Sequence, residues 1–376
     1  MTIKTIGVPT EIKPQENRVA LTPAGAERLA KDGFDVIVQS DSGVGSGFDN
    51  DAYRNVGAKI VDDAAAVFAG ADMIVKVKEP LPEEYGLLRE GQTLFTYLHL
   101  AASRPLTDAM VDTGAYCFAY ETLEVGGRLP LLTPMSEVAG RMAVQEGAKH
   151  LEKPMGGSGI LLGGVPGVPR AKVLVLGGGI VGINAARMAC GLGADVIMMD
   201  IDLDRLRYLD EVMPRNCRTL YSQQLSIREQ LPNIDLLVGA VLIPGGAAPK
   251  LVCREDLSLM REGSVIVDVA VDQGGCVETC KPTTHEEPTF VVDGVVHYCV
   301  ANMPGAVPRT STMALTNATL DWMLRLAKLG PIEAPRQSRE LALASNVMAG
   351  TVTYPAVAEA FGLDCVPADT WAREQS

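Results

Sequence analysis

Short apolar runs alternate with amphipathic segments through about the first 125 residues, and the two kinds of segment repeat in a fixed order. The apolar runs have the length and content of buried strands, and the segments between them have the apolar spacing of helices. Repeated alternation of strand and helix predicts a parallel, doubly wound α/β sheet. The predicted strands cover 3–8, 34–39, 59–61, 72–76, 93–96 and 115–118, and the predicted helices cover 23–31, 51–56 and 63–68.

A second α/β series begins near residue 171, after a glycine-rich loop or hairpin at 156–167. Its predicted strands cover 172–176, 194–199, 235–239, 264–268 and 295–299. Long helices are predicted on both sides of this series, at 135–151 and 310–328, and an alanine-rich helical tail is predicted at 341–362. Helices in these positions can return the chain to the first sheet. We therefore expect a discontinuous substrate domain, 1–130 with 305–376, and a nucleotide-binding domain at 131–304.

Three glycines follow the strand 172–176 directly, at positions 177, 179 and 182. They open a small-residue helix, and the next strand ends at Asp200, so strand, G-x-G-x-x-G, helix, strand and acid stand in one unit. Gly177 permits a tight turn, Gly179 lets the backbone approach a pyrophosphate, and Gly182 permits close packing of helix on strand. Glycines in a turn are weak evidence alone, but this register predicts a dinucleotide site.

Composition narrows the function classes. The chain of 376 residues is long enough for two domains, and 33 basic against 46 acidic residues give a net charge of −13. No polybasic run is present, which argues against a nucleic-acid partner, and no apolar stretch has the ~18 residues of a membrane span. The eight cysteines are scattered, as in a reduced protein. We expect a cytoplasmic protein with no metal, because Cys276, Cys280 and His285 lack a fourth ligand at a metal-like spacing.

Few residues in the first domain have both the type and the position for chemistry. His99 lies where an apolar strand gives way to polar sequence, and it suits either general acid/base work or a buried hydrogen bond to the backbone. Lys78 lies at a strand mouth before Pro80, on the same face as Lys76 by period-two spacing, and is either a ligand for an anion or a surface lysine. Arg18, on the long loop after the first strand, is either a carboxylate clamp or an ordinary loop arginine.

Asp272 closes an apolar run and opens Asp-Gln-Gly-Gly in the second domain. A carboxylate in this position can bind the nicotinamide ribose or orient a catalytic group. It can equally cap the backbone of its own turn.

Eight short motifs spread along the chain resemble those of the alanine dehydrogenase family, a group that also includes the nucleotide-binding subunit of proton-pumping transhydrogenase. They are G-V-P-T-E at 7–11, N-R-V-A-L-T-P at 17–23, K-V-K-E-P at 76–80, L-H-L-A-A at 98–102, P-M-S-E-V-A-G at 134–140, G-A-V-L-I-P-G at 239–245, V-D-Q-G-G at 271–275 and V-A-N-M-P at 300–304. The resemblance covers nearly the whole chain except about the last 50 residues, where it is diffuse.

The resemblance implies a role for each matching residue. His99 and Asp272 match the family's catalytic residues, and Arg18 and Lys78 match its ligands for the substrate carboxylate. Some family members have a metal-binding histidine in the tail, which 345–350 lacks. The implied cofactor contacts are Ser136, Gly177, Gly179, Ile180, Val181, Gly182, Asp200, Arg205, Ser222, Val241, Leu242, Val269, Ala270, Val271, Asp272, Val300, Ala301, Asn302 and Met303.

The implied fold is two doubly wound Rossmann-like domains with a cleft between them, linked by long helices. The implied activity is NAD-dependent L-alanine dehydrogenase, which interconverts L-alanine with pyruvate and ammonium, in a homo-oligomer that is usually a hexamer in the family. The alternative is a nucleotide-binding component of a transhydrogenase. Transhydrogenase subunits lack the histidine and the aspartate that match His99 and Asp272, so the resemblance favours the dehydrogenase branch.

Overall fold

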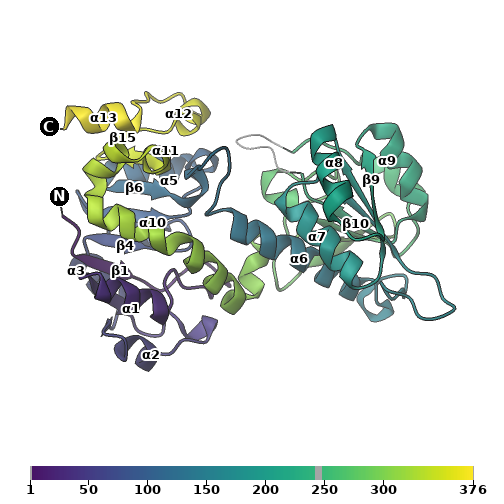
Figure 1. Ribbon diagram of the computed structural model, residues 1–376, viewed down its shortest axis with the longest axis horizontal. Helices are drawn as coiled ribbons and strands as arrows, with labels where there is room; N and C mark the ends of the chain where they lie inside the picture. The colour runs from purple at the N-terminus through teal and green to yellow at the C-terminus, as the bar shows by residue number, and fades with distance from the viewer. Residues whose placement is uncertain (1, 242–247, 376) are drawn as a thin grey trace. The chain divides into compact units, whose positions relative to one another are not determined.

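The computed structural model describes residues 2–241 and 248–375, apart from the side chain of Asp272. The chain forms two compact units (Figure 1), one of residues 1–135 with 307–376 and one of residues 136–306. The sequence placed the corresponding domain boundaries at 130/131 and 304/305. We call the discontinuous part unit 1 and the continuous part unit 2.

Unit 1 is built on a sheet that has eight strands within the described residues, in the order β15-β14-β6-β5-β4-β1-β2-β3. The strands from β6 to β3 in this order are parallel, whereas β14 pairs antiparallel with both β6 and β15. The strands are β1 (Thr5–Val8), β2 (Asp35–Gln39), β3 (Lys59–Val61), β4 (Met73–Val75), β5 (Thr93–Thr96), β6 (Tyr116–Ala119), β14 (Ser345–Met348) and β15 (Thr351–Val352). The prediction of a doubly wound parallel sheet is confirmed for its six consecutive members.

Side-chain caps begin several helices of unit 1. Thr22, Asp49 and Asp63 each accept a hydrogen bond from the backbone N–H three residues later, which satisfies an N–H that the helix itself cannot pair and stabilises it by about 1 kcal/mol. The helix α10 changes direction at Gly330, whose φ of 75° is not helical, and packs against α1, α11 and α13 (Figure 1). The helices are α1 (Pro23–Lys31), α2 (Asn50–Arg54), α3 (Ala64–Gly70), α4 (Pro82–Tyr85), α5 (Arg104–Asp112), α10 (Pro308–Gln337), α11 (Arg339–Ala344), α12 (Pro355–Phe361) and α13 (Ala368–Glu374).

The predicted helical tail at 341–362 is wrong in its middle. The strands β14 and β15 form a hairpin there, and α11 and α12 occupy only its ends. Val347 and Val352 are buried in the same core as Ile74 and Leu94. The alanine-rich composition favoured a helix, but pairing of β14 with β6 buries this segment as a strand and outweighs local propensity.

Unit 2 contains a sheet with seven strands in the described residues, in the order β12-β13-β11-β10-β7-β8-β9, all parallel except β12. The strands are β7 (Lys172–Leu176), β8 (Asp195–Asp200), β9 (Cys217–Tyr221), β10 (Leu236–Gly239), β11 (Val265–Asp268), β12 (Thr289–Val292) and β13 (Val295–Tyr298). The helices are α6 (Thr133–His150), α7 (Ile180–Gly191), α8 (Leu203–Val212) and α9 (Gln224–Gln230). Two glycines let α6 approach closely: a Cβ on Gly140 would stand 2.3 Å from the Val181 carbonyl oxygen, and one on Gly147 would stand 2.6 Å from Leu236.

Strand order reverses beside the first strand of each sheet, between β1 and β4 in unit 1 and between β7 and β10 in unit 2. In open α/β sheets, ligands bind outside the carboxyl ends of the strands at such a reversal. A ligand site is therefore expected in each unit beside the carboxyl ends of the strands, next to this reversal of strand order. Among the helices of the described residues, none is long and apolar enough to cross a membrane.

Candidate active site

The candidate substrate residues of unit 1 all follow the carboxyl ends of adjacent parallel strands. Arg18 lies in the loop after β1, Lys78 follows β4, and His99 follows β5. The strands β1, β4 and β5 are direct neighbours in the sheet. The sequence prediction of strand-end positions thus agrees with the topology, which sets these residues along the edge of the sheet beside the reversal of strand order.

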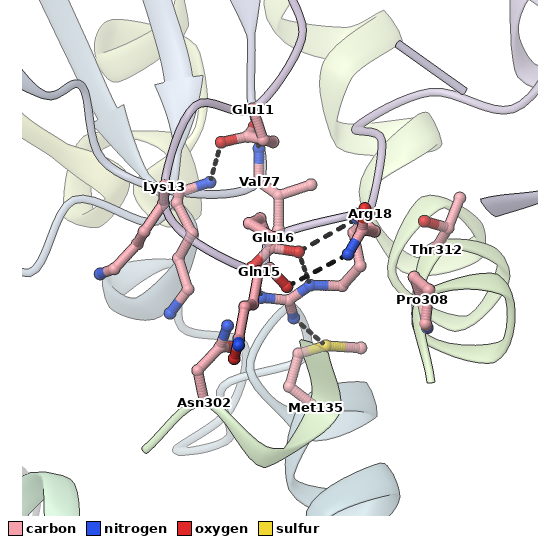
Figure 2. A network of polar contacts seen from close by, with 12 residues as sticks. Glu11, Lys13, Gln15, Glu16, Arg18, Val77, Met135, Asn302, Pro308 and Thr312 are labelled. Atoms are coloured by element: carbon pink, nitrogen blue, oxygen red, sulfur yellow. Dashed lines mark hydrogen bonds and ion pairs between the residues drawn. The ribbon is translucent and has the colours of Figure 1, made fainter. Parts of the chain in front are cut away.

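Arg18 is only 2% exposed, and its guanidinium is held from within the loop. Its Nε and Nη2 donate to the two carboxylate oxygens of Glu16 at 2.6 and 2.5 Å, and Nη1 donates to the Met135 sulfur at 3.1 Å (Figure 2). One interpretation of the sequence was that the planar guanidinium of Arg18 binds a substrate carboxylate through two hydrogen bonds. In the structure, two of its nitrogens already bind the Glu16 carboxylate in this way. Sequence reasoning missed Glu16, although its place two residues before Arg18 was a visible signal.

Lys78 is half-buried, and its backbone is fixed on both sides. The Lys78 N–H donates to Glu11 at 3.3 Å, and the Thr96 hydroxyl donates to the Lys78 carbonyl at 2.9 Å. Burial and the nearby Arg18 guanidinium lower the pKa of the Lys78 ammonium below its ordinary value. Among the described residues, no hydrogen bond or ion pair is made by this ammonium, but the Glu79 and Glu16 carboxylates act on it electrostatically and partly offset the lowering of its pKa. A half-buried cation next to a second cation favours the binding of an anion such as a carboxylate.

Lys76 has a different environment, despite the period-two spacing that relates it to Lys78. It is fully buried and forms ion pairs with Glu84 at 2.7 Å and Glu11 at 3.4 Å. Burial lowers the pKa of the Lys76 ammonium, but the two carboxylates outweigh it and raise that pKa overall. Burial also raises the pKa of the Glu11 carboxyl, which accepts the Val77 N–H at 2.5 Å. Glu11 therefore joins a core ion pair to the backbone that carries Lys78.

His99 has an unusual backbone conformation, with φ 51° and ψ 35°, in the left-handed region that few non-glycine residues adopt. Its imidazole lies parallel to the Tyr97 ring at 5.9 Å between centroids, and its side chain is 45% exposed. His150 and His297, in contrast, are buried and bonded to backbone carbonyls. Of the two interpretations of His99, its exposure and its place at a strand end favour acid/base chemistry.

The candidate cofactor residues of unit 2 follow the carboxyl ends of all six parallel strands. These are Gly177, Gly179, Ile180, Val181 and Gly182 after β7, Asp200 at the end of β8 with Arg205 beyond it, Ser222 after β9, Val241 after β10, Val269, Ala270, Val271 and Asp272 after β11, and Val300, Ala301, Asn302 and Met303 after β13. Ser136 lies instead in the first turns of α6. Leu242 and the side chain of Asp272 lie outside the described part of the structure.

The three glycines after β7 meet different surroundings. Gly177 has a φ of 103°, and a Cβ on it would stand 2.7 Å from the Ala240 carbonyl oxygen. A Cβ on Gly182 would stand 1.9 Å from the Gly177 carbonyl oxygen. A Cβ on Gly179 would meet nothing within 4 Å, so packing does not require glycine there. The open space in front of Gly179, at the N-terminus of α7, fits the phosphates of a dinucleotide.

Asp200, at the end of the neighbouring strand β8, and Arg205, in the helix α8, hold this turn. The Gly178 N–H donates to Asp200 Oδ2 at 2.6 Å, and the Asp202 N–H donates to Oδ1 at 2.9 Å. Arg205 Nε donates to the Gly178 carbonyl at 2.5 Å. Each carboxylate oxygen has a second lone pair, so Asp200 keeps acceptors for ribose hydroxyls while it fixes the glycine turn.

Asp268 holds the backbone of the segment that contains Asp272. Asp268 was not identified from the sequence. It is fully buried at the end of β11 and accepts the N–H groups of Ala270 and Val277, each at 3.0 Å. Burial raises the pKa of its carboxyl above the ordinary value. A Cβ on Gly275 would stand 2.8 Å from its carboxylate, so glycine at 275 makes room for it. The 3₁₀ turn Val269–Gln273, which contains Asp272, is thus held at its start by the buried Asp268 carboxyl group.

The pair Cys276 and Cys280 lies in the same region, and Cys276 contacts Asp268 at 3.8 Å through its sulfur. Among the described residues, no group of three or more His, Cys, Asp or Glu side chains is arranged to hold a metal ion.

Two models of one protein family match this chain, one in each half. The family model of the alanine dehydrogenase/PNT N-terminal domain matches residues 7–139, and that of the C-terminal domain matches residues 143–355. The chain is 55% identical over 372 residues to the alanine dehydrogenase of Bacillus subtilis, covering 99% of this chain and 98% of the relative. It is 57% identical over 364 residues to the alanine dehydrogenase of Halomonas elongata, covering 96% of this chain and 98% of the relative.

Two solved structures show the same architecture. A structure described as L-alanine dehydrogenase superimposes with a TM-score of 0.93 at 51% identity, covering 95% of this chain and 99% of the other. A transhydrogenase from Sinorhizobium meliloti superimposes with a TM-score of 0.80 at 25% identity, covering 94% of this chain and 100% of the other.

Proposed function

Because the chain belongs to the alanine dehydrogenase/PNT family, we propose that it is an NAD-dependent L-alanine dehydrogenase, which interconverts L-alanine with pyruvate and ammonium. The observation that carries the proposal is the unbroken similarity to alanine dehydrogenases, 55% and 57% identical over at least 96% of this chain. The geometry of unit 1 supports it, because Lys78 offers a cation and His99 an exposed imidazole at neighbouring strand ends.

In this proposal, the substrate carboxylate binds to Lys78 and Arg18. Lys78 supplies an ammonium that no other described residue pairs, and Arg18, oriented by Glu16, supplies a second positive charge next to it. Holding the carboxylate fixes the Cα–H bond relative to the cofactor, which is the positioning part of catalysis. This arrangement selects 2-amino and 2-oxo acids over analogues that lack the carboxylate charge.

Proton transfer falls to His99. Its imidazole nitrogens can accept a proton from water as it adds to the reacting carbon and return one to the departing amine. The glycine turn after β7 and Asp200 would hold a nicotinamide dinucleotide, which would accept the hydride of alanine in one direction and supply it in the other. Asp272, on the turn that Asp268 supports, orients the cofactor ribose.

NAD is the proposed form of the nicotinamide dinucleotide. Asp200 offers carboxylate oxygens to ribose hydroxyls, and the same negative charge repels the 2′-phosphate of NADP. We also propose a cytoplasmic hexamer, following the family resemblance. Light scattering on the purified protein measures the number of subunits.

One experiment tests the function. Purified protein is mixed with NAD and each of a panel of amino acids, among them L-alanine, glycine and 2-aminobutyrate, and NADH absorbance is followed. We expect the highest kcat/KM with L-alanine, and no reaction with alaninamide, which lacks the anionic carboxylate. No NADH with any amino acid, together with tight NADH binding, would instead favour the second candidate, a nucleotide-binding component of a transhydrogenase, to which the fold is also similar.

A further inference from the structure

Glu121 reaches from the end of one strand to the backbone at the end of the next. It lies in the 3₁₀ turn Tyr120–Thr122 after β6, and β6 pairs in parallel with β5, which leads to His99. Its Oε1 accepts the His99 N–H at 2.6 Å and the Leu98 N–H at 3.1 Å, and its Oε2 lies 3.2 Å from the same Leu98 nitrogen. One carboxylate thus holds two consecutive N–H groups.

These two N–H groups lie beyond the end of β5 and, within the described part of the chain, do not pair with the backbone of a neighbouring strand. The strand β5 ends at Thr96, and Tyr97 makes the last long bond to the neighbouring strand segment, at 3.4 Å to the Val77 carbonyl. On the far side, the turn is anchored independently, because the Thr107 hydroxyl donates to the Leu100 carbonyl at 3.0 Å. Between these two anchors, the N–H groups of Leu98 and His99 are held by Glu121.

The held conformation is one that His99 does not favour by itself. A left-handed φ of 51° brings the Cβ of an L-residue close to its own backbone, and the conformation persists only where its surroundings fix it. Two charge-assisted hydrogen bonds to one carboxylate supply such a constraint. The parallel contact with the Tyr97 ring limits the imidazole on one face, and the Tyr97 hydroxyl is itself fixed on the Leu131 carbonyl at 2.6 Å.

We propose that Glu121 is a positioning residue for catalysis, which acts through the backbone of Leu98 and His99 to hold the His99 imidazole where protons are transferred. The inference rests on the proposed role of His99 in the dehydrogenase reaction. The Glu121 carboxylate lies 4.0 Å from His99 Nδ1, which is ion-pair distance for a protonated imidazole but too long for a hydrogen bond, so its hydrogen bonds reach the ring only through the backbone. The proposed action is therefore chiefly geometric and runs through these two backbone N–H groups.

Three substitutions separate geometry from charge. Glu121→Gln keeps the length of the side chain and one oxygen in the place of Oε1, which accepts both N–H groups. Glu121→Asp keeps the charge but is one methylene too short, and Glu121→Ala removes both properties. We expect Ala and Asp to lower kcat about 100-fold, the effect of a small misplacement of a catalytic group, and Gln to keep kcat within about fivefold of wild type. The KM for pyruvate and the Kd of NADH should stay within about twofold in all three, because Lys78 and unit 2 are unchanged.

Glu124→Gln serves as a matched control, since Glu124 lies three residues further along the same segment. It should leave kcat unchanged. A double-mutant cycle then asks whether Glu121 acts through His99. In a His99→Ala background, Glu121→Ala should lower the residual turnover no further, because the group that it positions is gone.

The outcomes are distinct. The inference is overturned if Glu121→Asp is active while Glu121→Gln is not, if Glu121→Ala keeps wild-type kcat, or if its effect persists at full size without His99. If His99→Ala itself keeps normal turnover, the proposed role of His99 fails as well, and the two failures are thereby separated.

Discussion

Lys78 and Arg18 differ in how their positive charges are compensated. Arg18 shares a two-bond ion pair with Glu16, whereas the backbone of Lys78 is fixed by Glu11 and Thr96. In the proposed function, the Arg18 charge is already oriented by Glu16, and the Lys78 ammonium makes the contact that forms and breaks with the substrate. Lys78 is therefore the residue on which the pH dependence of substrate binding should depend.

Pyruvate binding should weaken as pH rises towards 10.5. Only the protonated ammonium attracts a carboxylate, and burial together with Arg18 lowers the pKa of Lys78 below the ordinary 10.5, so the charge is lost earlier than in water. Above that pKa, Kd should rise about tenfold per pH unit. Calorimetric titration of the NADH complex with pyruvate, without ammonium and at a series of pH values, measures this Kd. In Lys78→Arg the weakening should move to higher pH, and an identical profile in both proteins would contradict the assignment.

The lowered pKa also has a consequence for folding. The folded state holds the Lys78 proton less tightly than the unfolded chain does, so this group adds stability as pH rises between its folded pKa and 10.5. Binding and stability should therefore respond to alkaline pH in opposite directions.

Asp200 should determine the choice of cofactor. Its carboxylate is held next to the glycine turn by Gly178, and its neighbour Ile201 is 70% exposed and carries no charge to balance a phosphate. We expect NAD to exceed NADP in kcat/KM by at least about 100-fold, the scale of a repulsive or missing charged contact. Asp200→Ala with Ile201→Arg should shift preference towards NADP. A wild-type protein that uses both cofactors equally would show that Asp200 does not face the ribose.

At the scale of elements, two glycines at the junction of β7 and α7 differ in their roles. Gly182 is needed for packing of the helix on the strand, whereas Gly179 is proposed to make room for a ligand. Gly179→Ala places a methyl group in open space at a φ of −70°, which any residue adopts, so the melting temperature should not fall. Affinity for NADH should fall at least about tenfold, because that methyl group blocks the close backbone approach to the pyrophosphate.

Gly182→Ala is the matched control, because its Cβ would stand 1.9 Å from the Gly177 carbonyl oxygen. This substitution forces the helix off the strand and should destabilise the fold by more than about 2 kcal/mol. Thermal unfolding and NADH fluorescence titration of both variants check the contrast. Normal NADH affinity in Gly179→Ala would refute the proposed position of the phosphates.

The elements that the sequence predicted correctly are those with local patterns. The strand 172–176, the glycine turn and α7 follow from apolar runs and glycine spacing within one segment. The hairpin of β14 and β15 does not, because Ser345–Met348 is a strand only through its pairing with the distant β6. A turn signal was present at Gly350, which follows Ala349 in a left-handed conformation, but the alanines around it favoured a helix.

The candidate site shows the same limit. His99, Lys78 and Arg18 could be proposed from the sequence because strand ends are visible in it. Glu121 and Glu16 were not, since their importance lies in backbone and side-chain contacts that no local pattern records.

At the scale of the whole molecule, the two units differ in how the chain builds them. Unit 2 is one continuous segment with its own sheet and core, which includes Leu174, Leu237 and Ile266. Unit 1 needs two distant segments, joined where β14 pairs with β6 and where the Thr312 hydroxyl accepts the Val19 N–H at 3.1 Å. The continuous unit should therefore be able to fold alone.

A fragment of residues 131–306, which begins just before α6, should fold cooperatively and bind NADH with a Kd within about tenfold of the full chain. It carries the glycine turn, Asp200 and the segment that Asp268 supports, but neither Lys78 nor His99, so it should not oxidise alanine. Circular dichroism during thermal unfolding tests the fold, and NADH fluorescence tests binding. Added NADH should raise the melting temperature of the fragment, as expected for a ligand that binds only the folded state. A folded fragment without NADH affinity would show that unit 1 contributes essential cofactor contacts.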